Sequence, residues 1–519
     1  MKRRRVLRIL TLLLAVMAIF VNYGKTSAQS DDIFRVGMEA AYPPFNWTQA
    51  DDSNGAVPIE GSSDFANGYD VQMAKRVAEG LGKKLLVVKT EWDGLVFSVN
   101  SGKIDAIMAG MSPTAERAKE IDFSKPYYNS DLTLVVNADG KFKDAKLLSD
   151  FKDAKVVAQL NTFHDTVIDQ IPGVIHMEPM ADFSSMRVAV QSGKADAYVA
   201  EKPEGVTAEN AGANLKMIVF EDGFETSPED TSIAIGLKKG NPDLDKMNDI
   251  LDGISNDERE AIMNHILSIQ EGGEELGFLA SMKNIFLENK AGFLKGTGVT
   301  LLISLVGTLI GLLIGMLIGI VKTIPEGSNS SANVLLAIVK GILNIYVQVL
   351  RGTPMIVQSM LLYFGLLQFA GIDLMPMTAA FIVVSINTGA YMAEVVRGGI
   401  NSIDKGQFEA CQALGMGHFQ TMRYVVLPQA FRNIIPSVGN EFIVNIKDTS
   451  VLNVISVSEL FFTTKSIAGA NLKYFETYLI TSAIYLILTL SVAGLLHLLE
   501  KKLRGSENYE KSNVLKSVN

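Results

Sequence analysis

The sequence predicts a chain of two domains that face different solvents: an α/β domain outside the cell, followed by an all-α domain that crosses a membrane several times. Three observations predict it. At 519 residues the chain is too long for one compact domain. It is 48% hydrophobic yet 20% charged, which indicates one apolar and one soluble part. The apolar runs lie at the N-terminus and after Gly296, whereas residues 31–275 read as soluble sequence.

The N-terminus has the three parts of a secretory signal peptide. Basic residues 2–5 precede an apolar stretch, residues 7–21, and small residues follow at 26–28. We expect residues 1–28 to be a signal peptide, either cleaved or kept as an anchor, and residues 29–272 to lie outside the cell. The net charge of -9 argues against nucleic-acid binding, because a phosphate-backbone binder needs a clustered basic face.

Short apolar strands alternate with amphipathic helices through the exported domain. Strand-like runs occur at residues 34–38, 85–88 and 104–109, and helix-like segments at 68–82 and 186–191. This alternation is typical of sheets that are covered by helices on both faces. A length of about 240 residues suits two lobes of ordinary domain size.

The second domain, residues 297–519, contains several segments that are apolar enough to cross a bilayer. With the first domain outside and the basic loop 397–432 inside, an odd number of crossings must separate them. We therefore expect three spans before the loop, with the apolar residues 333–350 as an interfacial helix that ends at the cytoplasmic surface. Residues 273–296 are expected to be a linker. The five predicted spans are 299–321, 355–370, 377–396, 434–457 and 478–499.

Seven motifs follow one another through the exported domain. They are Ala41-Tyr-Pro-Pro-Phe, Gly68-Tyr-Asp-Val, Glu91-Trp-Asp-Gly-Leu, Gly102-Lys-Ile-Asp-Ala, Met111-Ser-Pro-Thr-Ala-Glu-Arg, Ile121-Asp-Phe-Ser-Lys-Pro-Tyr and Gly193-Lys-Ala-Asp-Ala-Tyr. Together they resemble the polar amino acid branch of the bacterial solute-binding proteins, over nearly all of residues 31–271. The resemblance implies a two-lobed periplasmic-binding-protein-like domain of type II. Its hinge is expected near residues 133–136 and 218–221.

A free amino acid presents a carboxylate and an ammonium group, so its pocket needs a cation and an anion. Arg117 can hold a carboxylate through two parallel hydrogen bonds, and the resemblance implies this role, although on its own it reads as a surface arginine. Glu201 takes the place of the acid that binds the ammonium in relatives; it also reads as a solvated loop residue. Backbone groups near Gly110, Ser112 and Thr162 are expected to assist, with Thr162 at a helix start.

Three further residues are expected to face the substrate's side chain. Tyr42 and Trp92 resemble the aromatic walls of the family, although Trp92 also suits a core. Glu39 stands where binding proteins for basic amino acids often present an acid to the distal charge. A buried carboxylate without a partner is costly, so a cationic ligand would explain it; hydrogen bonds to nearby backbone are the alternative. Arginine, lysine or histidine is therefore the expected substrate, with glutamine as the competitor.

The loop 397–432 carries a second set of matching residues. Glu409-Ala410-Cys411, Gly415 and the run Val425-Val-Leu427-Pro428 resemble the coupling sequence of ABC importer permeases, with Cys411 for alanine and Val425 for isoleucine. The resemblance implies a type I ABC importer permease fold, in which a helix, a glycine turn and a second helix fit a groove of a separate ATPase.

Glu394 and Glu441 lie in or beside predicted spans, where ionisable residues are costly and usually functional. The motifs around them also resemble amino acid permeases. Both are candidates for a substrate contact within the membrane. They serve equally well as structural partners of Arg397 and Lys447.

The chain contains no Gly-x-x-x-x-Gly-Lys-Ser/Thr phosphate loop. We therefore expect no cofactor on this chain, with ATP and Mg²⁺ bound by a cytoplasmic ATPase dimer. The expected assembly, in membrane lipid, is a homodimer of this chain; a heterodimer with a second permease is the alternative. No metal site or catalytic spacing is predicted, so an enzyme is disfavoured. An amino-acid-gated channel would need pore helices between the lobes, and a sensor would need a signalling domain.

Overall fold

The computed structural model describes residues 32–62, 64–211, 214–269, 277–325 and 330–504. These fall into two compact units. One unit contains Met1–Gly296 together with Phe364–Leu374 and Asn453–Thr481, and the other contains Thr297–Tyr363, Met375–Leu452 and Ser482–Asn519. The predicted signal peptide lies outside the described residues.

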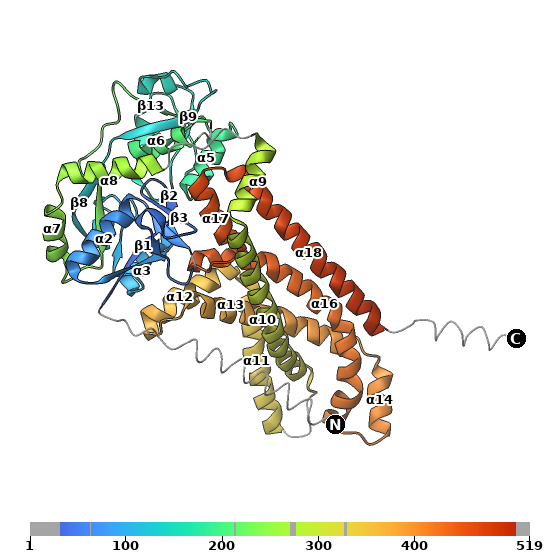
Figure 1. Ribbon diagram of the computed structural model, residues 1–519. Coiled ribbons are helices and arrows are strands. Elements are labelled where there is room, and N and C mark those ends of the chain that lie inside the picture. Colours follow the sequence, from blue (N-terminus) through green and yellow to red (C-terminus); the bar gives the residue numbers. More distant parts are fainter. Residues whose placement is uncertain (1–31, 63, 212–213, 270–276, 326–329, 505–519) are drawn as a thin grey trace. The chain divides into compact units, whose positions relative to one another are not determined.

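The first lobe is built on a five-stranded sheet in the order β6-β1-β7-β14-β8 (Figure 1, blue and green). β1 pairs in parallel with β6 and β7, whereas β14 runs antiparallel to β7 and β8. Val36, Ile107 and Ile235 on the inner strands are fully buried, which explains their apolar sequence. The strands are β1 (Ile33–Met38), β6 (Lys84–Lys89), β7 (Ala106–Ile107), β8 (Asp122–Asn129) and β14 (Ser232–Leu237), and the helices α2 (Tyr69–Leu81), α3 (Leu95–Ser101), α7 (Leu244–Asp252) and α8 (Asn256–Ile269).

The second lobe repeats this plan with the order β11-β10-β12-β9-β13. β10 is parallel to β11 and β12, and β9 is antiparallel to β12 and β13. β9 is the first strand after the chain enters the second lobe, and β14 is the first strand after it returns to the first lobe. Each of them runs antiparallel to both of its neighbours. The predicted two-lobed fold of type II is confirmed. The elements are β9 (Leu132–Asn137), β10 (Lys155–Val157), β11 (Ile175–His176), β12 (Ala197–Glu201), β13 (Leu215–Ile218), α4 (Phe163–Val167), α5 (Phe183–Gln191) and α6 (Lys202–Asn210).

The chain crosses between the lobes at two adjacent points. The first crossing joins β8 to β9, and the second precedes β14. The Ser130 N–H donates to the Thr231 carbonyl oxygen at 3.0 Å, so the two crossings lie side by side. The predicted hinge segments are wrong: residues 133–136 follow the first crossing by a few residues, and residues 218–221 precede the second by about ten. Residues 133–136 belong to β9, whose pairing with β12 makes them part of the lobe's sheet.

The predicted linker, residues 273–296, is helical in its described part. α9 (Phe278–Glu288) occupies its centre, and α10 (Lys290–Thr323) begins inside it. The described part of the predicted linker therefore has regular helical structure, and most large apolar side chains of α9 are exposed, among them Leu279 at 77%.

The membrane unit is helical, and a row of glycines sets the packing of two of its long helices. A Cβ atom at Gly307, Gly311, Gly315 or Gly319 of α10 would lie within 2.3 to 2.7 Å of a side chain of α13 (Pro376–Asn401). The four glycines recur every fourth residue, so they form one ridge. Small residues on such a ridge let two membrane helices approach closely.

The identity of one span differs from the sequence prediction. Within the described ranges, four helices are long and apolar enough to cross a membrane: Lys290–Thr323, Ser331–Gly352, Pro376–Asn401 and Tyr474–Leu499. A fifth candidate is a pair, His418–Ile455 with Leu460–Asn471, that bends by 57°. α12 (Met355–Ala370) has only 16 residues. By length, the structure therefore favours Ser331–Gly352 as the span, whereas the sequence favoured 355–370 and placed 333–350 at the membrane interface.

A reporter fused after Leu350 is expected to report the outer side of the membrane. The parity argument still requires three crossings before the loop 397–432, and α10, α11 (Ser330–Gly352) and α13 now supply them. An alkaline phosphatase fusion, which is active only outside the cytoplasm, measures this. A matched fusion after Thr323 should be inactive, and an inactive fusion at Leu350 would contradict the reassigned span.

Candidate functional site

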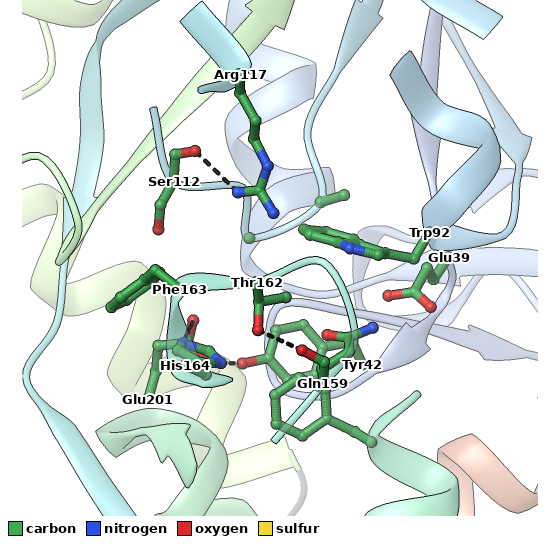
Figure 2. Close-up of a pocket in the computed structure, with 13 residues that line it drawn as sticks. Glu39, Tyr42, Trp92, Ser112, Arg117, Gln159, Thr162, Phe163, His164 and Glu201 are labelled. Atoms are coloured by element: carbon green, nitrogen blue, oxygen red, sulfur yellow. Dashed lines mark hydrogen bonds and ion pairs between the residues drawn. The ribbon is translucent and has the colours of Figure 1, made fainter. Parts of the chain in front are cut away.

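The eight substrate-contacting residues predicted from the sequence line one pocket between the two lobes (Figure 2). Arg117, Glu39 and Glu201 lie at different edges of this pocket. The first lobe contributes the residues up to Arg117, and the second lobe those from Gln159 onward. The lining consists of Glu39, Tyr42, Trp92, Ala109, Gly110, Ser112, Arg117, Gln159, Thr162, Phe163, His164, Phe183 and Glu201.

A buried carboxylate, Asp70 at the start of α2, holds the turn that carries Glu39 and Tyr42. Tyr127 donates to Asp70 Oδ1 at 2.6 Å, and Asn46 Nδ2 donates to its Oδ2 at 2.8 Å. Asn46 Oδ1 in turn accepts the Ala40 N–H at 2.8 Å. Burial raises the pKa of Asp70 to about 7, against the opposite effect of its hydrogen bonds. The Gly68-Tyr-Asp-Val motif therefore supports the pocket from behind.

Gly110 is required by its backbone conformation and by Tyr42. Its φ angle is +63°, a left-handed conformation that favours glycine. A Cβ atom there would lie 3.0 Å from Cε1 of Tyr42. Glycine at this position therefore allows the Tyr42 ring to pack directly against the backbone of the pocket.

Arg117 presents a positive charge that is bonded only to neutral groups. Its Nη1 donates to the Ser112 carbonyl oxygen at 3.0 Å and its Nη2 to that of Asn161 at 2.8 Å. The guanidinium lies 5.0 Å from the centre of the Trp92 ring. Burial lowers the pKa of Arg117 to about 10, so it remains charged at neutral pH. Among the described residues it forms no ion pair, so it is able to receive an anionic group.

Glu201, at the end of β12, is a buried anion with two contacts. Tyr42 donates its hydroxyl hydrogen to Oε2, and His164 Nε2 lies 3.2 Å from Oε1. Burial pushes the pKa of Glu201 upward, but His164 and the hydrogen bond from Tyr42 outweigh it and leave the pKa below its usual value. The carboxylate is therefore ionised and faces the pocket at neutral pH.

The lobes are closed on each other around this pocket. Tyr42 of the first lobe bonds Glu201 of the second. Arg117 reaches the Asn161 carbonyl, and Asn161 Nδ2 donates to Asp93 Oδ1 at 3.0 Å. Three polar contacts thus join the lobes through pocket residues or their direct neighbours.

Glu39 differs from Glu201 because it has no ion pair among the described residues. Its side chain is buried, and burial raises its pKa to about 8. The nearby charge of Lys465 and a hydrogen bond with Gln159 lower this pKa, whereas Glu91 and Asp182 raise it. One end of the pocket therefore holds a carboxyl group that changes its charge near neutral pH.

The aromatic residues play more mixed roles than the sequence suggested. Tyr42 stacks on Phe183 with 4.3 Å between ring centres. Trp92 lines the pocket beside Arg117 and also packs against the core. Sequence reasoning missed Gln159, Phe163, His164 and Phe183. His164 had a signal, since it follows Thr162 closely and is one of only five histidines.

Thr162 does precede a helix, as expected, but α4 has only five residues. Its hydroxyl donates to the Gln159 carbonyl oxygen at 2.7 Å. The side chain therefore fixes the turn that enters the helix.

The two acids predicted within the membrane unit differ in their surroundings. Glu394 contacts Lys322 at 2.5 Å and Arg397 at 2.8 Å, so both of its oxygens have a cationic partner. The alternative that paired Glu394 with Arg397 is the one observed. Glu441 is half-buried, and the described residues include no ion pair to it, with Lys447 or with any other cation.

The coupling sequence forms a helix that ends at its glycine. After α14 (Lys405–Ala413), the Gly415 N–H donates to the Gln412 carbonyl at 2.9 Å and the Met416 N–H to that of Cys411 at 3.0 Å. Gly415 has φ +72°. This is the Schellman arrangement, in which the residue after the helix is left-handed and is usually glycine. The motif's glycine is thereby explained, and Cys411 is a buried residue of α14.

The turn that follows exposes large apolar side chains. Leu414 is 80% exposed, Phe419 73% and Tyr424 66%. Glu409 and Ala410 are exposed beside them, and the chain then passes through α15 (His418–Thr421) and η6 (Met422–Val426). Leu427 and Pro428 open the next helix, α16 (Leu427–Asp448). A cluster of exposed apolar groups is typical of a protein-binding surface.

A two-lobed clamp and a coupling loop on one chain define a subunit of a binding-protein-dependent importer, and comparison with known families agrees. Residues 34–267 match the bacterial extracellular solute-binding proteins, family 3. Residues 311–505 match the binding-protein-dependent transport system inner membrane component. The chain belongs to this family of amino acid ABC importer permeases and carries its solute-binding domain on the same polypeptide. It is a multi-pass cell-membrane protein with its binding domain outside.

Individual relatives share the permease part. The glutamine transport system permease protein of Escherichia coli K12 is 42% identical over 161 residues, which cover 31% of this chain and 74% of the relative. A probable amino-acid permease of Bacillus subtilis 168 is 45% identical over 159 residues, 30% of this chain and 71% of the relative. The arginine transport system permease of the same organism is 37% identical over 166 residues, 32% of this chain and 76% of the relative.

Proposed function

We propose that this chain imports basic amino acids, namely arginine, lysine or histidine, with energy from a separate cytoplasmic ATPase. The observation that carries the choice of substrate is Glu39. It is a buried carboxyl group in the pocket without an ion pair among the described residues, and two further acids raise its pKa. A cationic side chain would supply the missing positive charge and remove the cost of ionising Glu39 in a buried site.

The remaining pocket residues hold the parts that all amino acids share. Arg117 binds the carboxylate, and the backbone at Gly110, Ser112 and Thr162 assists it. Glu201 binds the ammonium, which replaces one of its present partners, Tyr42 or His164. The present partners of the two charged groups support these roles. Arg117 bonds only neutral carbonyl oxygens, and a partner of Glu201 such as His164 is able to give way to an ammonium group, so that neither buried charge is left unpaired. Tyr42 and Trp92 border the side chain.

A homodimer of this chain with two ATPase subunits is the assembly we propose. The exposed apolar turn at Leu414, Phe419 and Tyr424 supports a protein partner at the coupling loop. ATP and Mg²⁺ are bound by that partner. The part of the chain that the structure describes offers up to five spans, and two such halves would enclose a path across the bilayer.

Glutamine is the second candidate, and one observation favours it. With a pKa of about 8, Glu39 is largely protonated at neutral pH and is able to donate a hydrogen bond to an amide oxygen. Gln159 lines the same end of the pocket. A relative that is 42% identical carries glutamine in its name, and another carries arginine.

The pH dependence of binding distinguishes the two substrates. A pKa of about 8 leaves about 1% of Glu39 ionised at pH 6 and about half at pH 8. Arginine needs the ionised form, so its affinity should rise roughly tenfold per pH unit between pH 6 and 7.5 and level off above pH 8. Glutamine prefers the protonated form, so its affinity should stay flat and then fall above pH 8.

Isothermal titration of the full chain in nanodiscs at pH 6, 7, 8 and 8.5 measures these slopes. The control is Glu39→Gln, which has no titratable group at this position and should abolish the slope for arginine. No detectable heat with arginine, lysine or histidine at any pH would reject the basic substrate.

A further inference from the structure

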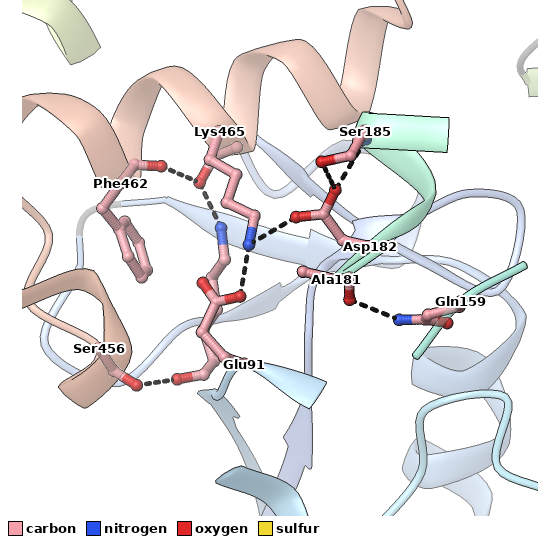
Figure 3. A network of polar contacts seen from close by, with 10 residues as sticks. Glu91, Gln159, Ala181, Asp182, Ser185, Ser456, Phe462 and Lys465 are labelled. Atoms are coloured by element: carbon pink, nitrogen blue, oxygen red, sulfur yellow. Dashed lines mark hydrogen bonds and ion pairs between the residues drawn. The ribbon is translucent and has the colours of Figure 1, made fainter. Parts of the chain in front are cut away.

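One lysine lies outside the binding domain's own sequence yet contacts both of its lobes. Lys465 is on α17 (Leu460–Asn471), within the stretch Asn453–Thr481. This stretch belongs to the same compact unit as the binding domain, although in sequence it connects α16 to α18 (Tyr474–Arg504) of the permease part. Figure 3 shows its ammonium group between two carboxylates.

The two carboxylates come from different lobes. Lys465 Nζ forms an ion pair with Glu91, which follows β6 of the first lobe. The same atom lies 3.1 Å from Asp182 Oδ2, at the start of α5 in the second lobe. The lysine side chain is only 13% exposed, so little solvent weakens these contacts.

Both acids are held by the lobe that carries them. Asp182 Oδ1 accepts the Ser185 N–H at 2.8 Å and its hydroxyl at 2.9 Å, as the cap of α5, which leaves Oδ2 for Lys465. Glu91 immediately precedes Trp92, and Asp182 immediately precedes Phe183; both of these aromatic residues line the pocket. The distance between the two carboxylates therefore depends on how far the lobes are closed.

Other contacts of the same stretch involve one lobe each. Lys89 of the first lobe lies 4.1 Å from the ring centre of Phe462 and also bonds Ser466. Arg187 of the second lobe donates to the Tyr474 hydroxyl at 2.6 Å. Each of these contacts involves a single lobe, whereas the double ion pair of Lys465 needs both lobes together.

We propose that Lys465 is the residue through which the permease part recognises the closed binding domain. When the lobes open, Glu91 and Asp182 separate, and one ammonium group is no longer able to pair with both. A poorly solvated ammonium group that loses one of two partners is destabilised, so contact with α17 favours the closed form. By linkage, closure of the lobes favours the contact to the same extent. This inference rests on the proposed function in amino acid import.

Amino-acid-stimulated ATP hydrolysis by the full chain, reconstituted with its ATPase in proteoliposomes, tests the proposal. Arginine and glutamine are each added at a saturating concentration, so that changes in affinity do not contribute. Lys465→Gln is expected to lower the stimulation at least about tenfold, within the usual range of coupling between sites. Lys465→Arg should keep most of it, because a guanidinium pairs with two carboxylates. Lys473→Gln, a neutral substitution of a nearby lysine, is the control and should match wild type.

Two single substitutions separate this role from a merely structural one. Glu91→Gln and Asp182→Asn should each cause a loss like that of Lys465→Gln, and neither should add to it in the double variant. Asparagine also caps a helix, so α5 should persist. Normal stimulation in Lys465→Gln, or a loss from only one of the two acids, would overturn the inference alone. A wild-type chain that neither amino acid stimulates would overturn the proposed function as well.

Discussion

Replacing Arg117 by alanine should lower the affinity for every amino acid substrate at least about 100-fold, because a carboxylate in the pocket would lose its charged partner. The affinity of Arg117→Lys should lie between those of wild type and Arg117→Ala, since an ammonium group keeps the charge but does not offer two parallel donors. The effect should be equal for arginine and glutamine, because both present the same carboxylate. Isothermal titration of the full chain measures it.

Lys119→Ala is the matched control for Arg117. Both residues lie in the short helix η3 (Arg117–Lys119), but Lys119 is exposed and does not line the pocket. Its removal should leave the affinity unchanged. If Arg117→Ala bound amino acids within about threefold of wild type, the carboxylate would have to lie elsewhere.

Replacing Leu414 by glutamate should release the ATPase while leaving amino acid binding intact. Leu414 is 80% exposed, so the fold tolerates a charge there. In a complex, however, the charge would be buried in an apolar contact without a partner, which is strongly unfavourable. The expected result is at least about a tenfold loss of co-purifying ATPase, which corresponds to about 1.4 kcal/mol.

Leu414→Met is the control for this substitution, because it keeps an apolar side chain of similar size and should retain the ATPase. Circular dichroism and substrate titration of both variants check that the chain is otherwise intact. Retention of the ATPase by Leu414→Glu would show that the exposed turn is not the coupling surface.

The sequence predicted the pocket well because its motifs encode local geometry. Arg117 and Tyr42 each lie in a short motif, Gly110 immediately precedes one, and the resemblance to the family assigned their roles. The resemblance to the family assigned Glu201, which the structure shows to be the last residue of β12. Local patterns thus carried all eight predicted residues into one pocket.

Contacts between distant segments could not be predicted in this way. Lys465 meets Glu91 across 374 positions of the chain, and no periodicity or spacing links the two residues. The same limit applies to Phe183 beneath Tyr42. The partners of an ionisable group follow from the tertiary fold, and a single sequence does not reveal them.

The difference over one span has another cause. Residues 333–350 and 355–370 are both apolar, so hydropathy did not separate them, and parity fixed the number of crossings without saying which helix crosses. The lengths decide it, since the first segment forms a 23-residue helix and the second a 16-residue helix.

The most direct test of the account is the ATPase activity of the full chain purified together with its cytoplasmic ABC ATPase in lipid nanodiscs, with and without added amino acids. The account predicts that hydrolysis rises when arginine, lysine or histidine is added, and that it stays at the basal rate with an amino acid that does not bind. A rate of ATP hydrolysis that does not change with any amino acid, or transport by the chain with no ATPase attached, would contradict it.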